Sequence, residues 1–357
     1  MTTYTPRVRS KVDSFISQLR ARVGQPVNIT EWSMFLTFDV MGVVGFSKDF
    51  HQLEDAKEHS VIKGVHDQMA TIGLLSQVPW FLYLLGSIPG LTGTYRSFME
   101  YCARQVNEKK ALWEKTESQD PVDIISWLLK AVKDKDSSAP PSDGALQDDG
   151  RVVIIAGSDT TGATLANAFY FLTTNQHIYK QLQRDLDTLF SDVGDSFTYE
   201  QVRNIPYVEA IIHETLRLKP AVPSGPPRVT PPGGLQVDEV WIPGDVNILV
   251  PPYILQRDDR NFVAADKFMP ERWLVENKKR MILNDQAFFP FQIGPYGCVG
   301  KQLAYMNLRL AIVLVALNFD LGLAPGEDGV EFDKGAKDTF TLTLSPLQVI
   351  FNERAKA

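Results

Sequence analysis

The chain has 357 residues, enough to bury a large core in one big domain or two ordinary ones. Hydrophobic residues make up 44% and charged residues 22%, the balance of an ordinary soluble globular protein. The net charge of −7 argues against nucleic acid as a partner, and two cysteines, Cys102 and Cys298, exclude a disulfide or zinc framework.

The first fifty residues predict two scaffold helices. Residues 4–22 place Val8, Val12 and Phe15 on one face, which is typical of an amphipathic helix. Thr30–Val44 is predicted as a second helix, with Thr30 as its N-cap. The polar, basic N-terminus lacks the apolar core of a signal peptide.

The most apolar run covers residues 72–92. Its length would suit a membrane span, but Pro79, Gly86 and Pro89 argue against one continuous helix. We therefore expect two short apolar segments. Ordinary core packing and peripheral contact with a membrane both stay open for them.

Two more helices are predicted at Tyr95–Lys115 and Val122–Val132, and Cys102 in the first is interpreted as a small core residue. Residues 133–150 are polar and rich in Pro and Ser, which predicts a surface loop. We interpret this loop as a connection within a single domain of residues 1–357, because the candidate site needs residues from the middle and the end of the chain.

A long buried helix is predicted at Asp149–Leu172. Gly157 weakens the helix at that point, where Asp159 and Thr160 add a carboxylate and a hydroxyl. A local kink with a threonine bonded to a carbonyl would explain these residues equally well. Small residues recur three to four positions apart and predict a side against which a flat ligand can lie: Gly157, Thr160 or Thr161, Thr164 and Ala168.

Tyr179–Phe190 is predicted as an outer amphipathic helix and Tyr207–Leu218 as a buried one. Glu214 and Arg217 share one face of the buried helix, where a surface ion pair would be the usual explanation. Apolar neighbours on that face favour a buried pair instead. A buried pair needs further hydrogen-bond partners, and Arg272 is a candidate.

Residues 220–232 are too rich in proline for a helix. Periodicity predicts an apolar helix at 301–319. Short strands are predicted from alternation at Leu235–Val237, Val240–Ile242, Val246–Val250, Thr339–Leu344 and Leu347–Phe351, with the last two joined at Ser345–Pro346.

Phe291–Gly300, with the sequence FQIGPYGCVG, contains Cys298 among three glycines just before this helix. A thiolate there is stabilised by backbone N–H groups and by the helix dipole. Gly294 and Gly300 let the backbone turn and let a flat ligand approach. A buried structural cysteine is the alternative, but the spacing Phe-x-x-Gly-x-x-x-Cys-x-Gly favours an axial thiolate ligand to haem iron.

This decamer and the segment AGSDTT at 156–161 resemble the haem-thiolate monooxygenases of the cytochrome P-450 family. The resemblance implies a mainly α fold with small β-sheets and haem b as the cofactor. The family usually has Arg or His two residues before the cysteine, where this chain has Tyr296, so that propionate contact is weakened. The implied haem contacts are Cys298 as the metal ligand, with Phe291, Gly294, Gly300, Gly157, Arg228 and Tyr296.

The resemblance also implies two further groups of residues. Thr160 and Asp159 would be catalytic, delivering protons on the distal face of the haem. Glu214, Arg217 and Arg272 would form a structural triad that locks the cysteine loop. Near its front the chain lacks the family's N-terminal anchor, first helices and first sheet, which indicates truncation.

The implied reaction inserts one oxygen atom from O2 into an apolar small molecule, as in fungal secondary metabolism. No dinucleotide motif follows a predicted strand, so an NADPH-cytochrome reductase or similar donor is implied. The family is expected at the endoplasmic reticulum membrane face; without an anchor this chain would be cytoplasmic or peripheral. Two alternatives stay open: a haem-thiolate isomerase or dehydratase that needs no reductase, and a truncated fragment without catalytic activity.

Overall fold

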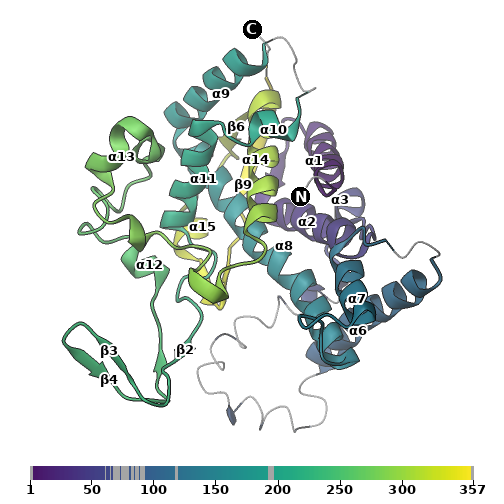
Figure 1. The fold of residues 1–357 in the computed structure, drawn as a ribbon. Helices are drawn as coiled ribbons and strands as arrows, with labels where there is room; N and C mark the ends of the chain where they lie inside the picture. The colour runs from purple at the N-terminus through teal and green to yellow at the C-terminus, as the bar shows by residue number, and fades with distance from the viewer. Residues whose placement is uncertain are drawn as a thin grey trace.

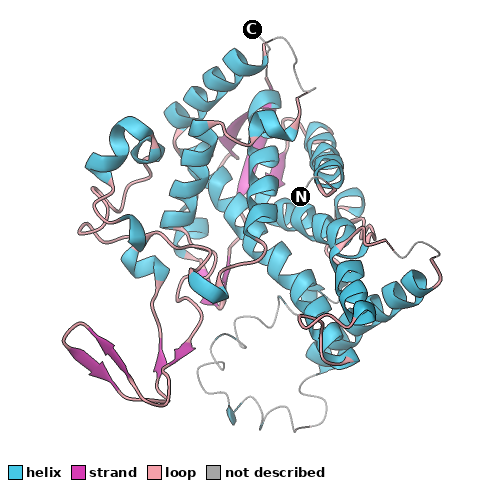
Figure 2. Cartoon of the chain, in the orientation of Figure 1, coloured by secondary structure: helices cyan, strands magenta, loops and turns pink. Residues whose placement is uncertain are grey.

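The computed structural model describes residues 3–60, 62–64, 66, 73, 80, 81, 84, 88, 93–116, 120–191 and 197–354. Helices dominate this part of the chain, and the short strands form small separate sheets (Figure 2). This confirms the mainly α fold with small β-sheets that was predicted.

The longest described helix, α8 (Asp143–Thr174), runs through the middle of the molecule (Figure 1). α2 (Ile29–Met41), α11 (Pro206–Leu218) and α14 (Lys301–Asn318) all pack against it. α14 is buried over most of its length, because apolar side chains cover nearly its whole circumference. The central helices therefore come from the early, middle and late parts of the chain.

The N-terminal helices form as predicted, except at one cap. α1 (Thr5–Arg20) buries the expected apolar face. α2 ends in a π-helical turn, η1 (Gly42–Phe46), so the helical segment extends slightly past the prediction. Asn28 is the N-cap residue rather than Thr30, and Thr30 Oγ1 donates instead to the Ser345 carbonyl at 3.0 Å. That contact comes from the far end of the chain and has no local sequence signal.

The prediction of a loop over residues 133–150 is wrong at both ends, because the loop in the structure is shorter. α7 (Ile124–Asp134) runs to its start, and α8 begins already at Asp143, which leaves residues 135–142 as the connection. Ser142 Oγ caps α8 by accepting from the Ala145 N–H at 3.1 Å. Leu146 is buried, and a Cβ on Gly150 would lie 2.1 Å from Val106 of α6 (Gly93–Glu114). This close packing holds a polar segment in helical form.

A three-stranded sheet joins the two ends of the chain. β9 (Gln348–Glu353) lies between β1 (Pro26–Asn28) and β6 (Phe319–Leu323), and both pairings are antiparallel. The register places Val349 opposite Val27 and Leu323. Phe351 and Val349 are fully buried in the same core cluster as α1 and α14. The strands predicted on either side of Ser345–Pro346 therefore belong to different sheets.

The other sheets are two-stranded. β3 (Leu235–Val237) and β4 (Val240–Ile242) pair across a tight turn and match the predicted bounds. β2 (Arg228–Val229) pairs with β5 (Asn247–Ile248), which is shorter than predicted. β7 (Lys337–Thr339) pairs with β8 (Thr341–Thr343).

Short helical turns and one longer helix complete the described part. α9 (Gln176–Phe190) packs on α14, as its amphipathic pattern predicted. The remaining elements are α3 (Gln52–Asp55), α10 (Tyr199–Val202), α12 (Pro252–Leu255), η2 (Pro270–Trp273), α13 (Val275–Met281), η3 (Asp285–Ala287), η4 (Gly294–Tyr296) and α15 (Val330–Lys334).

The predicted apolar run at 72–92, with its candidate membrane contact, lies mostly outside the described residues. Within the described part, Ile29–Phe46 is long and apolar enough to cross a membrane by length and composition alone. However, 83% of that stretch is buried inside the molecule, as in the core helix of a soluble protein. Its hydrophobicity is accounted for by packing.

Candidate functional site

The loop before α14 presents Cys298 at the surface. The Cys298 N–H donates to the Phe291 carbonyl at 2.8 Å and the Gly297 N–H to the Gly294 carbonyl at 3.0 Å, so the loop is closed by its own backbone. Gly294 has a φ of +74°, which favours glycine at that position. Cys298 is a free, exposed thiol. α14 starts at Lys301, so the thiol lies near its N-terminus.

Three residues close to Cys298 in the sequence of this loop have exposed side chains. Ile293 is 75% exposed, Tyr296 is 74% exposed and Val299 is fully exposed. Phe291, by contrast, turns inward and packs on Tyr305 of α14, with ring centroids 5.3 Å apart. Apolar groups gathered at the surface beside a thiol are typical of a ligand-binding face.

Arg228 comes from β2 and lies beside this loop. Its guanidinium carbon is 5.2 Å from the centroid of the Tyr296 ring, within reach of a cation–π interaction. One of its N–H groups donates to the Pro227 carbonyl at 3.0 Å. The structure thus brings together Arg228 and Tyr296, the two residues predicted to share the propionate contact. Their binding role stays a prediction.

Behind the loop, Glu214, Arg217 and Arg272 form one fully buried cluster. Arg217 Nε and Nη2 donate to the two Glu214 oxygens at 2.9 and 2.8 Å, and Arg272 Nε donates to Glu214 Oε1 at 2.9 Å. The Trp273 indole and the Met269 N–H also donate to Glu214. The other arginine N–H groups donate to the carbonyls of Val263, Ala264, Ala265, Lys267 and Gln256.

This cluster reaches the cysteine loop through Gln256, a residue that belongs to no recognisable motif. The Gln256 carbonyl accepts from Arg217 Nη1 at 2.6 Å, and its side-chain amide donates to the carbonyls of Leu216 and Arg217. Its Oε1 accepts from the Phe289 N–H at 3.2 Å, two residues before Phe291. A continuous chain of hydrogen bonds therefore connects the buried ion pairs with the Cys298 loop.

The glycines on the small-residue side of α8 pack against α2. A Cβ on Gly157 would lie 2.2 Å from Met41 Sδ, and one on Gly162 would lie 2.6 Å from Met34 Sδ, so both glycines face α2. Thr161 and Ala168 are buried. A side chain at position 157 would have to displace Met41, so Gly157 lets α8 and α2 pack closely. Its predicted contact with the cofactor stays a prediction.

A different line of α8 faces outward. Val152 and Ala156 are exposed and Thr160 is half-buried, and the three are spaced by one helical turn. Thr160 Oγ1 donates to the Ala156 carbonyl at 2.6 Å. The threonine therefore lies on the open side of the helix, and its predicted catalytic role stays a prediction.

Asp159 turns away from Thr160, into the molecule. Its side chain is buried, and Oδ1 lies 3.2 Å from His66 Nε2. The other imidazole nitrogen, Nδ1, pairs with the Glu58 carboxylate. Burial opposes protonation of His66, but hydrogen bonds with Asp159 and Glu58 outweigh it and raise the pKa of His66 to about 10. His66 and Glu58 carried no recognisable motif in the sequence.

A cleft of about 160 Å³ adjoins this group. Its wall combines apolar and acidic residues and does not include Cys298 or Thr160. The lining residues are Thr30, Glu31, Met34, Phe35, Glu58, His66, Asp159, Thr341, Leu342, Thr343 and Leu344.

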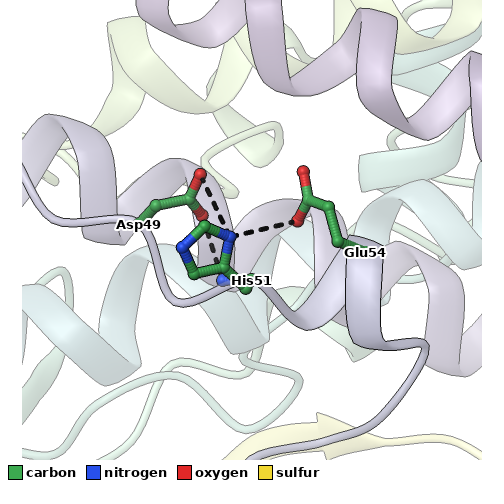
Figure 3. Close-up of side chains that lie close together, drawn as sticks. All are labelled: Asp49, His51 and Glu54. Carbon is green, nitrogen blue, oxygen red and sulfur yellow. Dashed lines mark hydrogen bonds and ion pairs between the residues drawn. The ribbon is translucent and has the colours of Figure 1, made fainter.

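Asp49, His51 and Glu54 form a second cluster with the spacing of metal ligands (Figure 3). Lys11 already supplies the positive charge there, with Nζ 2.6 Å from Asp49 Oδ2 and 3.2 Å from Glu54 Oε1. The cluster is thus an ion-pair network that joins α1 to α3.

The cytochrome P-450 family model matches residues 1–351. The chain belongs to the cytochrome P-450 family.

Fungal monooxygenases are among the proteins to which the chain is similar. It is 43% identical over 290 residues to cytochrome P-450 monooxygenase eupD of a Phoma species, covering 80% of this chain and 100% of that protein. It is 34% identical to the monooxygenase FCK2 of Fusarium pseudograminearum over 98% of this chain, but spans only 62% of that relative. The haem domain of cytochrome P450DA shares the fold with a TM-score of 0.82 at 21% identity, over 99% of this chain and 74% of that one.

Proposed function

We propose that this P-450 chain is a haem-thiolate monooxygenase that inserts one oxygen atom from O2 into an apolar small organic molecule. The observation that carries the proposal is the exposed Cys298 thiol, held by a closed backbone loop at the start of α14. The family implies haem, and the residues present fit it. A thiolate suits iron, exposed Ile293 and Val299 suit the macrocycle, and Arg228 suits a propionate.

When bound, haem b supplies the activation of O2 and the transfer of one oxygen atom. The protein residues have supporting roles. Cys298 Sγ would bind the iron, and the buried Glu214 cluster fixes the loop that carries this cysteine through Gln256. Arg228 anchors the edge of the group, with Tyr296 packed against the guanidinium. Thr160, on the open side of α8, would hold and deliver a proton at its Oγ1.

The second oxygen atom leaves as water, which takes two electrons and two protons. An NADPH-cytochrome reductase or a similar external donor would supply the electrons. The fungal origin of the named relatives supports a substrate from fungal secondary metabolism and a place at the endoplasmic reticulum membrane face.

The test is a coupling measurement on the haem-loaded chain with an added reductase. Replacing Thr160 with Ala should keep the spectrum and NADPH consumption, while the fraction of electrons found in product falls about tenfold or more, because proton delivery is lost and peroxide forms instead. Thr174→Ala is the matched control. Thr174 lies on the same helix, is exposed, and makes the same type of bond, to the Tyr170 carbonyl at 2.8 Å.

Full coupling in Thr160→Ala would remove Thr160 from its proposed role. Substrate turnover without any NADPH consumption would instead identify an isomerase or dehydratase.

A further inference from the structure

Asp159 is held by a half-buried imidazole that is itself held by a second carboxylate. Glu58, His66 and Asp159 form this series in order, from the segment after α3 to the middle of α8. The His66 side chain is only 29% exposed and that of Asp159 only 10%. A charge placed so far from solvent is stable only with a close partner of opposite sign.

We propose that His66, fixed by Glu58, is a positioning residue that holds the Asp159 carboxylate on the α2 side of α8, and that it thereby controls how electrons divide between product and peroxide. The effect on electron use rests on the proposed monooxygenase function. The ion pair that holds Asp159 concerns only this chain and can be tested without haem.

The geometry favours this role over a purely structural one. Thr160 and Asp159 are adjacent, yet Thr160 lies on the open line of α8 whereas Asp159 points to His66. Asp159 has a further weak contact with Ser158 Oγ at 3.5 Å. Among the described residues, the direction of the carboxylate therefore depends mainly on the His66 ion pair.

The charges around His66 set how it responds to pH. Asp159 of α8 and Glu58 contact the ring directly, and Glu31 of α2 lines the same cleft. The β8 segment contributes the uncharged Thr341 and Thr343 to that cleft. Among the described residues that line the cleft, His66 is the only basic group. Removing Glu58 should return the titration of the imidazole to the neutral range.

The first experiment is an NMR titration of the histidines in the haem-free chain. Wild-type His66 should stay protonated from pH 6 to 8.5, whereas in Glu58→Gln it should titrate within that range. His51→Asn is the matched control, because His51 lies near Asp49 and Glu54 but is 61% exposed, and the variant should leave the His66 signal unchanged. A wild-type His66 that titrates near pH 6.5 would overturn the positioning role.

The second experiment measures the peroxide fraction against pH in the haem-loaded chain with reductase. In wild type, the peroxide fraction should stay constant from pH 6 to 8.5. In Glu58→Gln, the peroxide fraction should increase several-fold as the pH rises, because His66 loses its charge. In His66→Asn, the peroxide fraction should be high at every pH. His66→Lys, which keeps a cation, should recover most of the coupling.

A peroxide fraction that is independent of pH in Glu58→Gln, together with wild-type coupling in His66→Asn, would contradict the proposal that His66 controls how electrons divide between product and peroxide. Complete absence of reductase-driven oxidation would refute the monooxygenase function instead, and the haem-free titration would still decide the ion pair.

Discussion

The two sides of the Cys298 loop differ in how their polar groups are satisfied. Behind the loop, Glu214, Arg217 and Arg272 are fully buried, and every charged group there has protein partners. In front of it, Cys298, Tyr296 and Val299 are exposed. The buried side is complete without a ligand, whereas the exposed side combines a thiol, apolar surface and a cation that a ligand would satisfy. The residues that hold the loop in place are therefore different from the residues that would contact a ligand.

The largest expected effect is on the buried side. Glu214→Ala leaves two arginines buried without their carboxylate, and we expect it to lower the free energy of unfolding by about 3–5 kcal/mol. Urea unfolding monitored by circular dichroism measures this. The matched control is Glu200→Ala, because Glu200 pairs with Arg203 at the surface, where such a pair contributes about 1 kcal/mol or less. Equal effects of the two variants would mean that the buried cluster is not the support of the loop.

His213 tests how completely water is excluded from the buried side of the Cys298 loop. It packs between Trp273, Phe288 and Tyr305, and burial is the main reason that its pKa falls to about 4. The unfolded chain therefore binds the extra proton between about pH 6.5 and pH 4, so stability falls as pH falls through that window.

We expect wild type to lose up to about 2 kcal/mol more than His213→Phe between pH 7 and pH 5. Denaturant titrations of both proteins at the two pH values give this difference directly. An identical loss in wild type and variant would show that His213 is solvated and protonates freely.

The smallest expected effect is on the exposed side. Arg228→Gln should weaken haem binding by roughly tenfold, because a charge-assisted hydrogen bond at a partly exposed site contributes about 1.5 kcal/mol. Tyr296→Phe keeps the ring beside the guanidinium and should change the affinity by less than about threefold. Quenching of tryptophan fluorescence by added haem measures both. A larger loss of haem affinity in Tyr296→Phe than in Arg228→Gln would make Tyr296, and not Arg228, the propionate anchor.

Local patterns predicted the elements around the site well. α11 and α14 bury apolar faces that are visible in the sequence, and β3 and β4 match their predicted bounds. The grouping of Glu214, Arg217 and Arg272 followed from the need of a buried pair for a third partner. Cys298 stood out because glycines and a helix start surround it.

Contacts between distant segments could not be predicted in this way. Gly157 has the spacing of a ligand-facing residue, and only the position of Met41 shows that it faces α2. Gln256 and His66 are single polar residues without a motif, and their partners come from other segments of the chain. The start of α8 was missed because polar residues form its first turns and the packing against α6 holds them.

The most direct test of the account is the carbon monoxide difference spectrum of the reduced, haem-loaded chain. Wild type should show the Soret shift of a thiolate-ligated haem, and Cys298→Ser should lose it. Cys102→Ser is the control and should keep it, since Cys102 is buried and burial raises the pKa of its thiol to about 12. A thiolate-type spectrum that persists in Cys298→Ser would contradict the assignment of Cys298 as the ligand.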